Sequence, residues 1–276
     1  MIDKKPIVSV VVTTYNRPDA LSLILLALNE QDTNDFEVIV ADDGSSSETK
    51  DAVELLKPKV SYKIRHVRQS HDGFRAAMIR NKSVSVADGE YLIFLDGDSV
   101  PQTSFISRHR KLAENNYFVS GTRAFLSSDF TDEILSNSLL VYRFGVCRWF
   151  YLFVQKKVNK FLPFLFFGEG FWRYLFKTKW QGVKTCNLGM WKKDFFLVNG
   201  FDESYYGWGY EDSDLIVRLI RSGVLRKEGR FALPVVHLCH VVNSRDRSEI
   251  NYGKLKEVID SCRIRAKLGI DKYILN

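Results

Sequence analysis

The sequence predicts an α/β fold in which helices cover a mostly parallel central sheet. Over the first 120 residues, strand and helix patterns alternate at short intervals. Two strand patterns, VIVADDGS and YLIFLDGDSV, end in acidic turns, as expected where loops gather at the carboxyl ends of parallel strands. With 276 residues, 45% of them hydrophobic, the chain can bury a sizeable core.

The first half follows this pattern element by element. IVSVVVTTY predicts a buried strand, and Pro18 opens a helix. DDGSSSE is a cluster of turn and N-cap residues that separates the second strand from the next helix. In order, the predicted elements are strand 7–15, helix 18–31, strand 36–42, helix 47–57, strand 62–67, helix 74–87, strand 91–96 and helix 102–115.

The alternation loosens beyond residue 120. YFVSGTRAFL predicts one strand over 117–126, and we expect residues 131–180 to be helical, basic and aromatic. The remaining predicted elements are a short strand and helix within 183–200, helix 210–222, strand 230–238 and helix 250–267.

Charge and cysteine content narrow the class of protein. The formal net charge is +7, but no nucleic-acid-binding motif is present, so we expect no nucleic acid partner. MIDKKPIVSV contains no apolar signal-peptide region, which predicts a cytoplasmic location. The four cysteines lie far apart without a C-x-x-C pair, which predicts reduced, buried thiols.

Residues 144–180 are dense in aromatic and basic side chains. Such a surface suits the anionic inner face of the cytoplasmic membrane, where the protein would be peripheral. The aromatic side chains could equally pack in the core or at the interface of a homo-oligomer. The sequence leaves both interpretations open.

The DGD stretch raises the question of what neutralises two carboxylates beside a buried strand. Gly97 allows the chain to turn, so Asp96 and Asp98 can face one point, and hard oxygen ligands there suit Mg²⁺ or Mn²⁺. The alternative is an Asp-Gly turn in which Asp98 caps the following helix. Asp42 and Asp43 end the second strand at the same sheet edge, which favours a pocket. No G-x-G-x-x-G follows the first strand, which disfavours a nicotinamide site.

The stretch GWGYEDSD places further carboxylates at a helix start. A helix from residue 210 puts Asp212 on the inward stripe of Leu215, Ile216 and Leu219, whereas Glu211 and Asp214 would lie nearer solvent. An inward carboxylate in a cleft can accept a proton. The alternative is that all three acidic residues merely favour helix initiation, but the stripe favours a base role for Asp212.

Three other side chains invite similar hypotheses. Arg80 lies on the sheet-facing side of its predicted helix and therefore needs an anion, either a diphosphate or an internal carboxylate. His237 and His240 follow a late strand on opposite faces, so we expect at most one to reach a metal ion.

The ordered motifs resemble those of the family 2 glycosyltransferases of the GT-A fold, notably bacterial enzymes of lipopolysaccharide, lipooligosaccharide or capsule synthesis. VVVTTYNRP, EVIVADDGS, FRAAMIRN and YLIFLDGDSVP match the donor half of that family. CNLGMWKKDFFLVNGFDESYYGWGYEDSDLIVRL resembles the acceptor half shared with β-1,4-galactosyltransferases and chondroitin-type polymerases. Together the matches cover residues 6–122 and 183–245.

The resemblance implies an inverting transfer of a sugar from a nucleotide-sugar, with UDP as carrier, to a glycan or lipid-linked acceptor. Asp212 matches the catalytic base, and Asp98 matches the ligand of Mn²⁺ or Mg²⁺. His240 would complete the metal site, in preference to His237. The implied donor-binding residues are Thr14, Tyr15, Asn16, Arg17, Asp42, Arg80, Asn81, Asp96 and Gly97, and the implied acceptor-binding residues are Trp208, Gly209 and Glu211.

The same resemblance divides the chain into four parts: a donor half (1–122), a helical aromatic and basic insertion (123–182), an acceptor and catalytic half (183–245) and a C-terminal helix (246–276). Two departures stand out. Tyr210 replaces the glycine of W-G-G-E-D, and the insertion matches nothing in the family pattern. The rival interpretations are a sugar nucleotidyltransferase, which would show a glycine-rich basic loop after the first strand, and a non-catalytic glycan-binding subunit.

Overall fold

The computed structural model describes residues 8–241 and 244–274. The strands are β1 Val8–Thr14, β2 Phe36–Asp42, β3 Lys63–Arg68, β4 Tyr91–Asp96, β5 Ser99–Pro101, β6 Tyr117–Ser120, β7 Thr122–Phe125, β8 Asn187–Trp191, β9 Leu225–Glu228 and β10 Pro234–His237. The α-helices are α1 Pro18–Asn29, α2 Ser47–Leu56, α3 Ala76–Ser85, α4 Phe105–Leu112, α5 Ser128–Asn137, α6 Val146–Val154, α7 Lys192–Leu197, α8 Glu211–Arg221 and α9 Ser248–Asp260.

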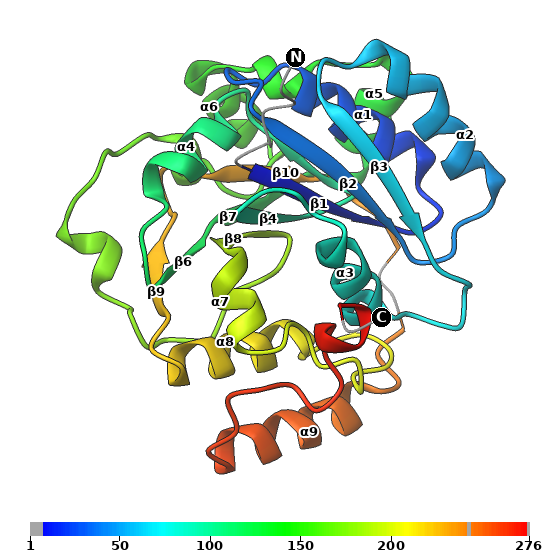
Figure 1. Cartoon of the computed structure of the whole chain (residues 1–276). Helices are drawn as coiled ribbons and strands as arrows, with labels where there is room; N and C mark the ends of the chain where they lie inside the picture. The colour runs from blue at the N-terminus through cyan, green and yellow to red at the C-terminus, as the bar shows by residue number, and fades with distance from the viewer. Residues whose placement is uncertain (1–7, 242–243, 275–276) are drawn as a thin grey trace, which may run out of the picture.

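A seven-stranded sheet of order β3-β2-β1-β4-β8-β6-β9 forms the centre, and a three-stranded sheet of order β5-β10-β7 accompanies it. The first four strands of the large sheet pair in parallel, while β8 runs antiparallel to β4 and β6. In Figure 1, α1 and α2 lie above this sheet, and α3, α7 and α8 lie below it. The predicted α/β architecture is confirmed.

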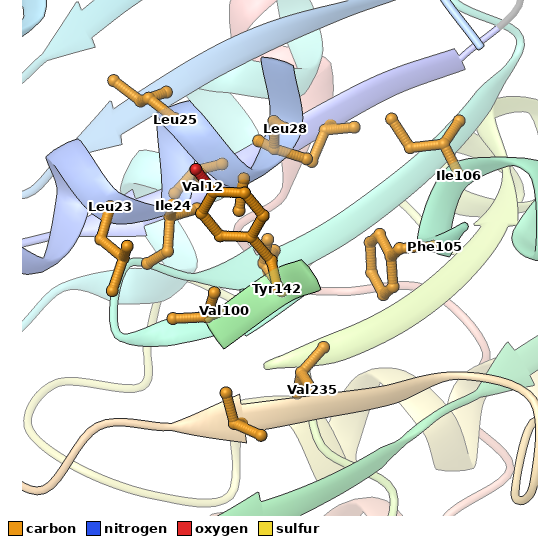
Figure 2. Close-up of a cluster of buried hydrophobic side chains, with 14 of the residues drawn as sticks. Val12, Leu23, Ile24, Leu25, Leu28, Val100, Phe105, Ile106, Tyr142 and Val235 are labelled. Carbon is orange, nitrogen blue, oxygen red and sulfur yellow. The ribbon is translucent and has the colours of Figure 1, made fainter. Parts of the chain in front are cut away.

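Alternation along the strands builds two separate cores. Val10 and Val12 of β1 pack with Ile24 of α1, in the cluster that Figure 2 shows. Val11 faces the other way, as does Phe94 of β4, into the core formed with α3, α7 and α8. Alternate residues of a strand therefore face different cores. Asp96, two residues after Phe94, lies on the same face of β4 as Phe94.

The second half departs from the prediction at strand boundaries. The predicted strand 117–126 is two strands, because the chain leaves the large sheet at Gly121, where a Cβ atom would lie 2.2 Å from the Asn187 side chain. The predicted strand 230–238 is shortened to β10, and β9 was not predicted. The last helix ends at Asp260, not at 267.

Most of segment 131–180 is not helical, contrary to the prediction. Only α5 and α6 are α-helices there, and single 3₁₀ turns follow at 162–164 and 171–174. Pro163 and Gly168 interrupt the pattern, and the irregular backbone is held by the buried guanidinium of Arg173, which donates to four carbonyl oxygens: those of Phe167, Gly168, Glu228 and Arg230. No helix in the described ranges is long and apolar enough to span a membrane.

All four cysteines are free, as predicted. Their expected burial is wrong for three of them, because only Cys186 lies inside, whereas Cys147, Cys239 and Cys262 are exposed.

Candidate active site

The ends of three neighbouring strands meet at one edge of the large sheet. Thr14 at the end of β1 is in register with Asp42 of β2, and Thr13 is in register with Asp96 of β4. The Gly97 amide donates to the Thr13 carbonyl at 2.7 Å, and a Cβ atom on Gly97 would lie only 2.8 Å from that oxygen. Glycine is therefore required here for close approach to β1, and the acidic turns share one edge as the sequence indicates.

Asp98 contacts both candidate histidines. His237 Nδ1 lies 2.9 Å from one carboxylate oxygen, and His240 Nε2 lies 3.1 Å from the other. Burial opposes ionisation of Asp98, but the hydrogen bonds from the two histidines outweigh it and hold the pKa of the carboxyl below its usual value. The hydrogen bond to Asp98 in turn raises the pKa of His240. The expectation that only one histidine could reach this point is wrong, because β10 ends at His237 and strand alternation does not extend to His240.

The three ligand atoms of Asp98, His237 and His240 lie within 4.8 Å of one another. One carboxylate and two imidazoles form a mixed oxygen and nitrogen donor set that fits a divalent transition-metal ion. The residues present thus fit the cation that the sequence predicts at this place.

Arg80 is buried between two carboxylates on the α3 and α8 side of the sheet. Its guanidinium lies 3.1 Å from Asp96 Oδ1 and 3.1 Å from Glu211 Oε1, and its Nε donates to Thr13 Oγ1. Burial raises the pKa of Asp96 and of Glu211, an effect that Arg80 opposes. Of the two partners that the sequence allowed for Arg80, the structure has the internal carboxylates.

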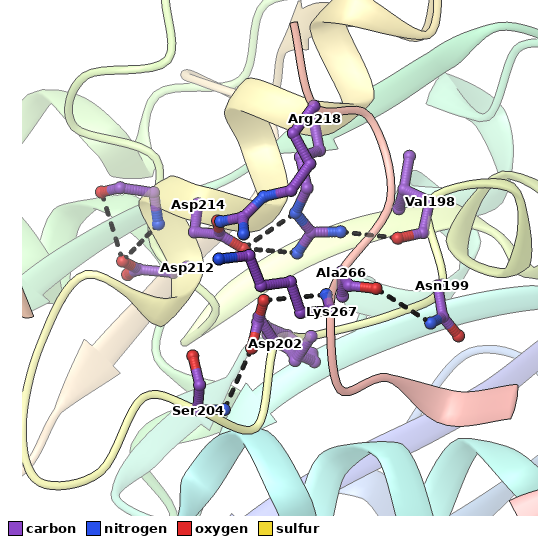
Figure 3. Close-up of polar contacts among 12 residues, drawn as sticks. Val198, Asn199, Asp202, Ser204, Asp212, Asp214, Arg218, Ala266 and Lys267 are labelled. Atoms are coloured by element: carbon purple, nitrogen blue, oxygen red, sulfur yellow. Dashed lines mark hydrogen bonds and ion pairs between the residues drawn. The ribbon is translucent and has the colours of Figure 1, made fainter. Parts of the chain in front are cut away.

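The first turn of α8 buries all three of its acidic residues. Asp212 is inward, as predicted, and its Oδ2 lies 3.3 Å from Lys184 Nζ. The expectation that Glu211 and Asp214 lie nearer solvent is wrong: Glu211 contacts Arg80, and Asp214 is fully buried against Arg218 of the same helix (Figure 3). Helical periodicity failed because α8 is covered on more than one side, by the sheet and by α9.

Several negative charges of the candidate site act on the buried thiol of Cys186. Its pKa is raised to about 12, first by burial and then by the negative charges of Asp96, Asp98 and Asp212. The Arg80 guanidinium, which contacts both Asp96 and Glu211, joins the end of β4 to the first turn of α8, where Asp212 lies.

The loop after β1 lies beside the loop after β2. Asn16 has a left-handed backbone, receives a hydrogen bond from Ser46 N at its Oδ1 and donates its own amide to Ser45 Oγ. Tyr15 is half-exposed and stacks on His71 with ring centroids 4.6 Å apart. Arg17 pairs with Asp19 at the surface. These side chains line the sheet edge where the sequence places the donor site.

Two of the residues expected to bind the donor have internal hydrogen-bond partners. Asp42 is fully buried and accepts hydrogen bonds from Ser45 N and His66 Nε2. Both donors of the Asn81 amide are bonded to the 201–203 segment, and its oxygen accepts from Phe201 N. Both side chains therefore support the site's framework.

Tyr210 explains one departure from the family pattern. It precedes α8 with φ +74°, a left-handed conformation in which glycine is favoured, and its ring packs 5.3 Å from that of Tyr252 on α9. In the same loop, Gly209 has φ +103°, and the half-buried Trp208 ring is covered by Arg245 at 4.9 Å. Compared with glycine, the tyrosine is less suited to this left-handed backbone conformation, but its ring contacts α9.

Sequence reasoning missed Arg123 and Lys184. Arg123 lies on β7 opposite Val235 of β10, and its charge acts on Asp96. Its guanidinium stacks over the Phe125 ring at 4.6 Å but has no hydrogen-bonded or ion-paired partner among the described residues. Neither residue stands in a recognisable motif. The pairing of β7 with β10 places Arg123 near the site, and the loop before β8 places Lys184 beside Asp212.

The family model described as Glycosyl transferase family 2 matches residues 9–178. The chain belongs to this family. This glycosyltransferase also matches, over residues 169–236, a model described as N-terminal domain of galactosyltransferase.

Similar proteins agree with this family. Hyaluronan synthase of Pasteurella multocida is 29% identical over 239 residues, which cover 78% of this glycosyltransferase and 23% of the relative. Validoxylamine A glucosyltransferase of Streptomyces hygroscopicus subsp. jinggangensis (strain 5008) is 32% identical over 233 residues, which cover 79% of this glycosyltransferase and 52% of the relative. The chain thus spans between about a quarter and a half of these relatives.

A solved structure has the same fold. The mannosyltransferase PcManGT from Pyrobaculum calidifontis, in complex with GDP-Man and Mn²⁺, superposes with a TM-score of 0.61 at 18% identity, covering 99% of this glycosyltransferase and 69% of that chain. The GT-A-like fold is therefore confirmed.

Proposed function

We propose that this glycosyltransferase moves a sugar from a UDP-sugar to a hydroxyl of a growing bacterial surface glycan or lipid-linked acceptor, with inversion at the anomeric carbon and with a divalent metal. One observation carries the proposal: the buried Arg80 contacts both Asp96 and Glu211, and so joins the turn of Asp98 to the helix start of Asp212, 114 positions apart in the sequence. A cation site and a candidate base thus face one region, as a transfer from a metal-bound diphosphate requires.

Asp98, His237 and His240 would hold the cation. Two imidazoles suit Mn²⁺ better than Mg²⁺, which prefers oxygen ligands and near-ideal octahedral geometry. When bound, the ion supplies electrostatic stabilisation of the departing diphosphate. The Mn²⁺ in the PcManGT complex supports this choice.

Arg123 is the side chain best placed to contact the donor diphosphate directly. Arg80 is occupied by Asp96 and Glu211, so its charge is already balanced within the protein. Arg123 keeps its guanidinium unpaired among the described residues, one strand away from His237. Guanidinium groups bind phosphate oxygens in a bidentate manner, which would orient the leaving group.

Asp212 would accept the proton of the acceptor hydroxyl. The freed oxygen attacks the anomeric carbon, the bond from that carbon to the diphosphate breaks, and the electron pair leaves with UDP. Attack from the side opposite the nucleotide gives inversion. Lys184 Nζ, 3.3 Å from Asp212 Oδ2, would hold this carboxylate in place beside the acceptor.

A direct assay tests the function. The protein is incubated with a panel of UDP-sugars with and without Mn²⁺, and release of UDP is measured, alongside an Asp98→Ala variant. We expect metal-dependent UDP release and a higher melting temperature with the matching donor, both lost in the variant. Release of pyrophosphate from a nucleoside triphosphate would support a nucleotidyltransferase instead. Absence of any donor or metal binding would support a non-catalytic subunit.

A further inference from the structure

Helix α6 has apolar side chains around almost its whole circumference. Trp149 and Leu152 point into the core, and Trp149 stacks on Phe164 with ring centroids 4.3 Å apart. The opposite side is also apolar but is open to solvent. Its side chains, together with one residue of the following loop, define the α6 surface: Val146, Phe150, Tyr151, Phe153, Val154 and Leu162.

This surface exceeds what a solvated helix face normally exposes. Val154 is 63% exposed, Leu162 is 60% exposed and Phe150 is 52% exposed. Phe161 contacts both Phe150 and Phe153, with centroids 5.1 and 6.4 Å apart, so the loop continues the helix surface.

The charge around the α6 surface is strongly positive. Residues 144–160, which include α6 and the turn after it, contain four lysines or arginines and no acidic residue, so they carry +4 of the chain's formal net charge of +7. Lys156 and Lys160 are exposed and have no ion-pair partner among the described residues. Arg148 on the helix lies over the aromatic rings of Phe144 and Tyr151, and it has no ion-pair partner among the described residues.

We propose that the α6 surface binds the face of an anionic lipid bilayer. Aromatic and aliphatic side chains enter the interface while the surrounding lysines contact acidic headgroups. A second copy of the chain is a poorer occupant, because a two-fold interface would bring two basic patches together. Lipid binding is independent of the proposed transfer reaction.

The turn that follows α6 is connected to the candidate cation site through β7. The turn after α6 is tied to β7, since Phe125 N donates to Asn159 Oδ1 at 2.8 Å and Val158 bridges Leu126. The Phe125 ring lies 5.1 Å from that of His237. If the proposed function holds, this proximity favours a lipid-linked acceptor over a free glycan.

Vesicle sedimentation tests the inference. We expect the full chain to sediment with vesicles of phosphatidylglycerol and phosphatidylcholine in equal parts, to remain in solution with phosphatidylcholine alone, and to dissociate at high salt. Lys156→Ala with Lys160→Ala should lower partitioning about 30-fold, and Phe150→Ser with Val154→Ser about 10-fold or more.

The matched control is Leu55→Ser with Lys59→Ala on and just after α2, where Leu55 is also 63% exposed and which lies away from α6 in Figure 1. This variant should sediment like the unaltered protein. Equal binding by the α6 and control variants would overturn the proposal, as would no binding to anionic vesicles. A dimer that the α6 variants dissociate, seen by size-exclusion chromatography with light scattering, would also overturn it.

Discussion

Arg80 of α3 bridges the end of β4 and the start of α8: its guanidinium lies 3.1 Å from both Asp96 and Glu211. These carboxylates are 115 positions apart in the sequence, and the buried cation balances them. Burial lowers the pKa of Arg80, but the charges of Asp96, Glu211 and Asp212 outweigh it, so the pKa is raised overall. One side chain thus joins the end of β4 to the start of α8.

Removing this cation should destabilise the fold. Arg80→Gln leaves the buried Glu211 and the half-buried Asp96 without a balancing charge, which typically costs about 3–5 kcal/mol. Urea denaturation checks it, with Arg143→Gln as control, because Arg143 pairs with Glu30 at the surface and should cost at most about 1 kcal/mol. Equal losses in the two variants would show that Arg80 is not the central ion pair described above.

The left-handed backbone at Tyr210 makes a comparison of two variants informative. Tyr210→Gly and Tyr210→Ala both lose the contact with Tyr252, but only alanine retains a Cβ atom at φ +74°. We expect the glycine variant to be more stable by about 1 kcal/mol, the reverse of the order in a helix interior. A more stable alanine variant would mean that the loop changes conformation.

His109 gives stability a defined pH dependence. Burial lowers its pKa to about 3, although the hydrogen bond with Asn187 opposes that shift. Above pH 6.5 both states are neutral at this residue. As the pH falls below 6.5 the unfolded chain binds a proton that the folded chain takes up only near pH 3, so stability is lost across that window, at about 1.4 kcal/mol per pH unit.

His109→Gln can still hydrogen-bond to Asn187 but does not titrate. Between pH 7 and pH 5, unaltered protein should lose about 2 kcal/mol more of its unfolding free energy than this variant. Parallel stability curves for the two proteins would contradict a buried, neutral His109.

The cation site should depend on both histidines. Because His237 and His240 each contact Asp98, alanine at either position should weaken Mn²⁺ binding about 10-fold or more. Calorimetric titration with Mn²⁺ measures this, with His71→Ala as control, since His71 lies outside the cluster. Unchanged affinity in one variant would remove that histidine from the ligand set.

The first half of the fold was predictable because its strands and helices carry clear periodicity and turn chemistry. The same rules fail where tertiary contacts decide. His237 and His240 meet at Asp98 because the strand ends between them, and strand alternation beyond His237 therefore has no meaning. Residues 131–180 are expected to be helical from their sequence. Much of this segment is irregular, and the hydrogen bonds that Arg173 donates to backbone carbonyl groups stabilise it.

Within the site, the sequence predicted which residues lie there better than it predicted which side chains they contact. Asp212 was placed inward correctly, but the same helical pattern put Asp214 near solvent because it could not show that α9 covers α8. Arg80 could bind a ligand or a carboxylate by its position in the sequence, and only the fold shows that Glu211 lies beside it.

The most direct test of the site is the turnover of Asp212→Asn measured together with its donor affinity. We expect UDP release to fall about 10²- to 10⁴-fold, because the proton acceptor is lost, while the affinity for UDP-sugar and Mn²⁺ stays unchanged. Turnover at the rate of the unaltered protein would contradict a site in which Asp212 is the base facing a donor held by Asp98.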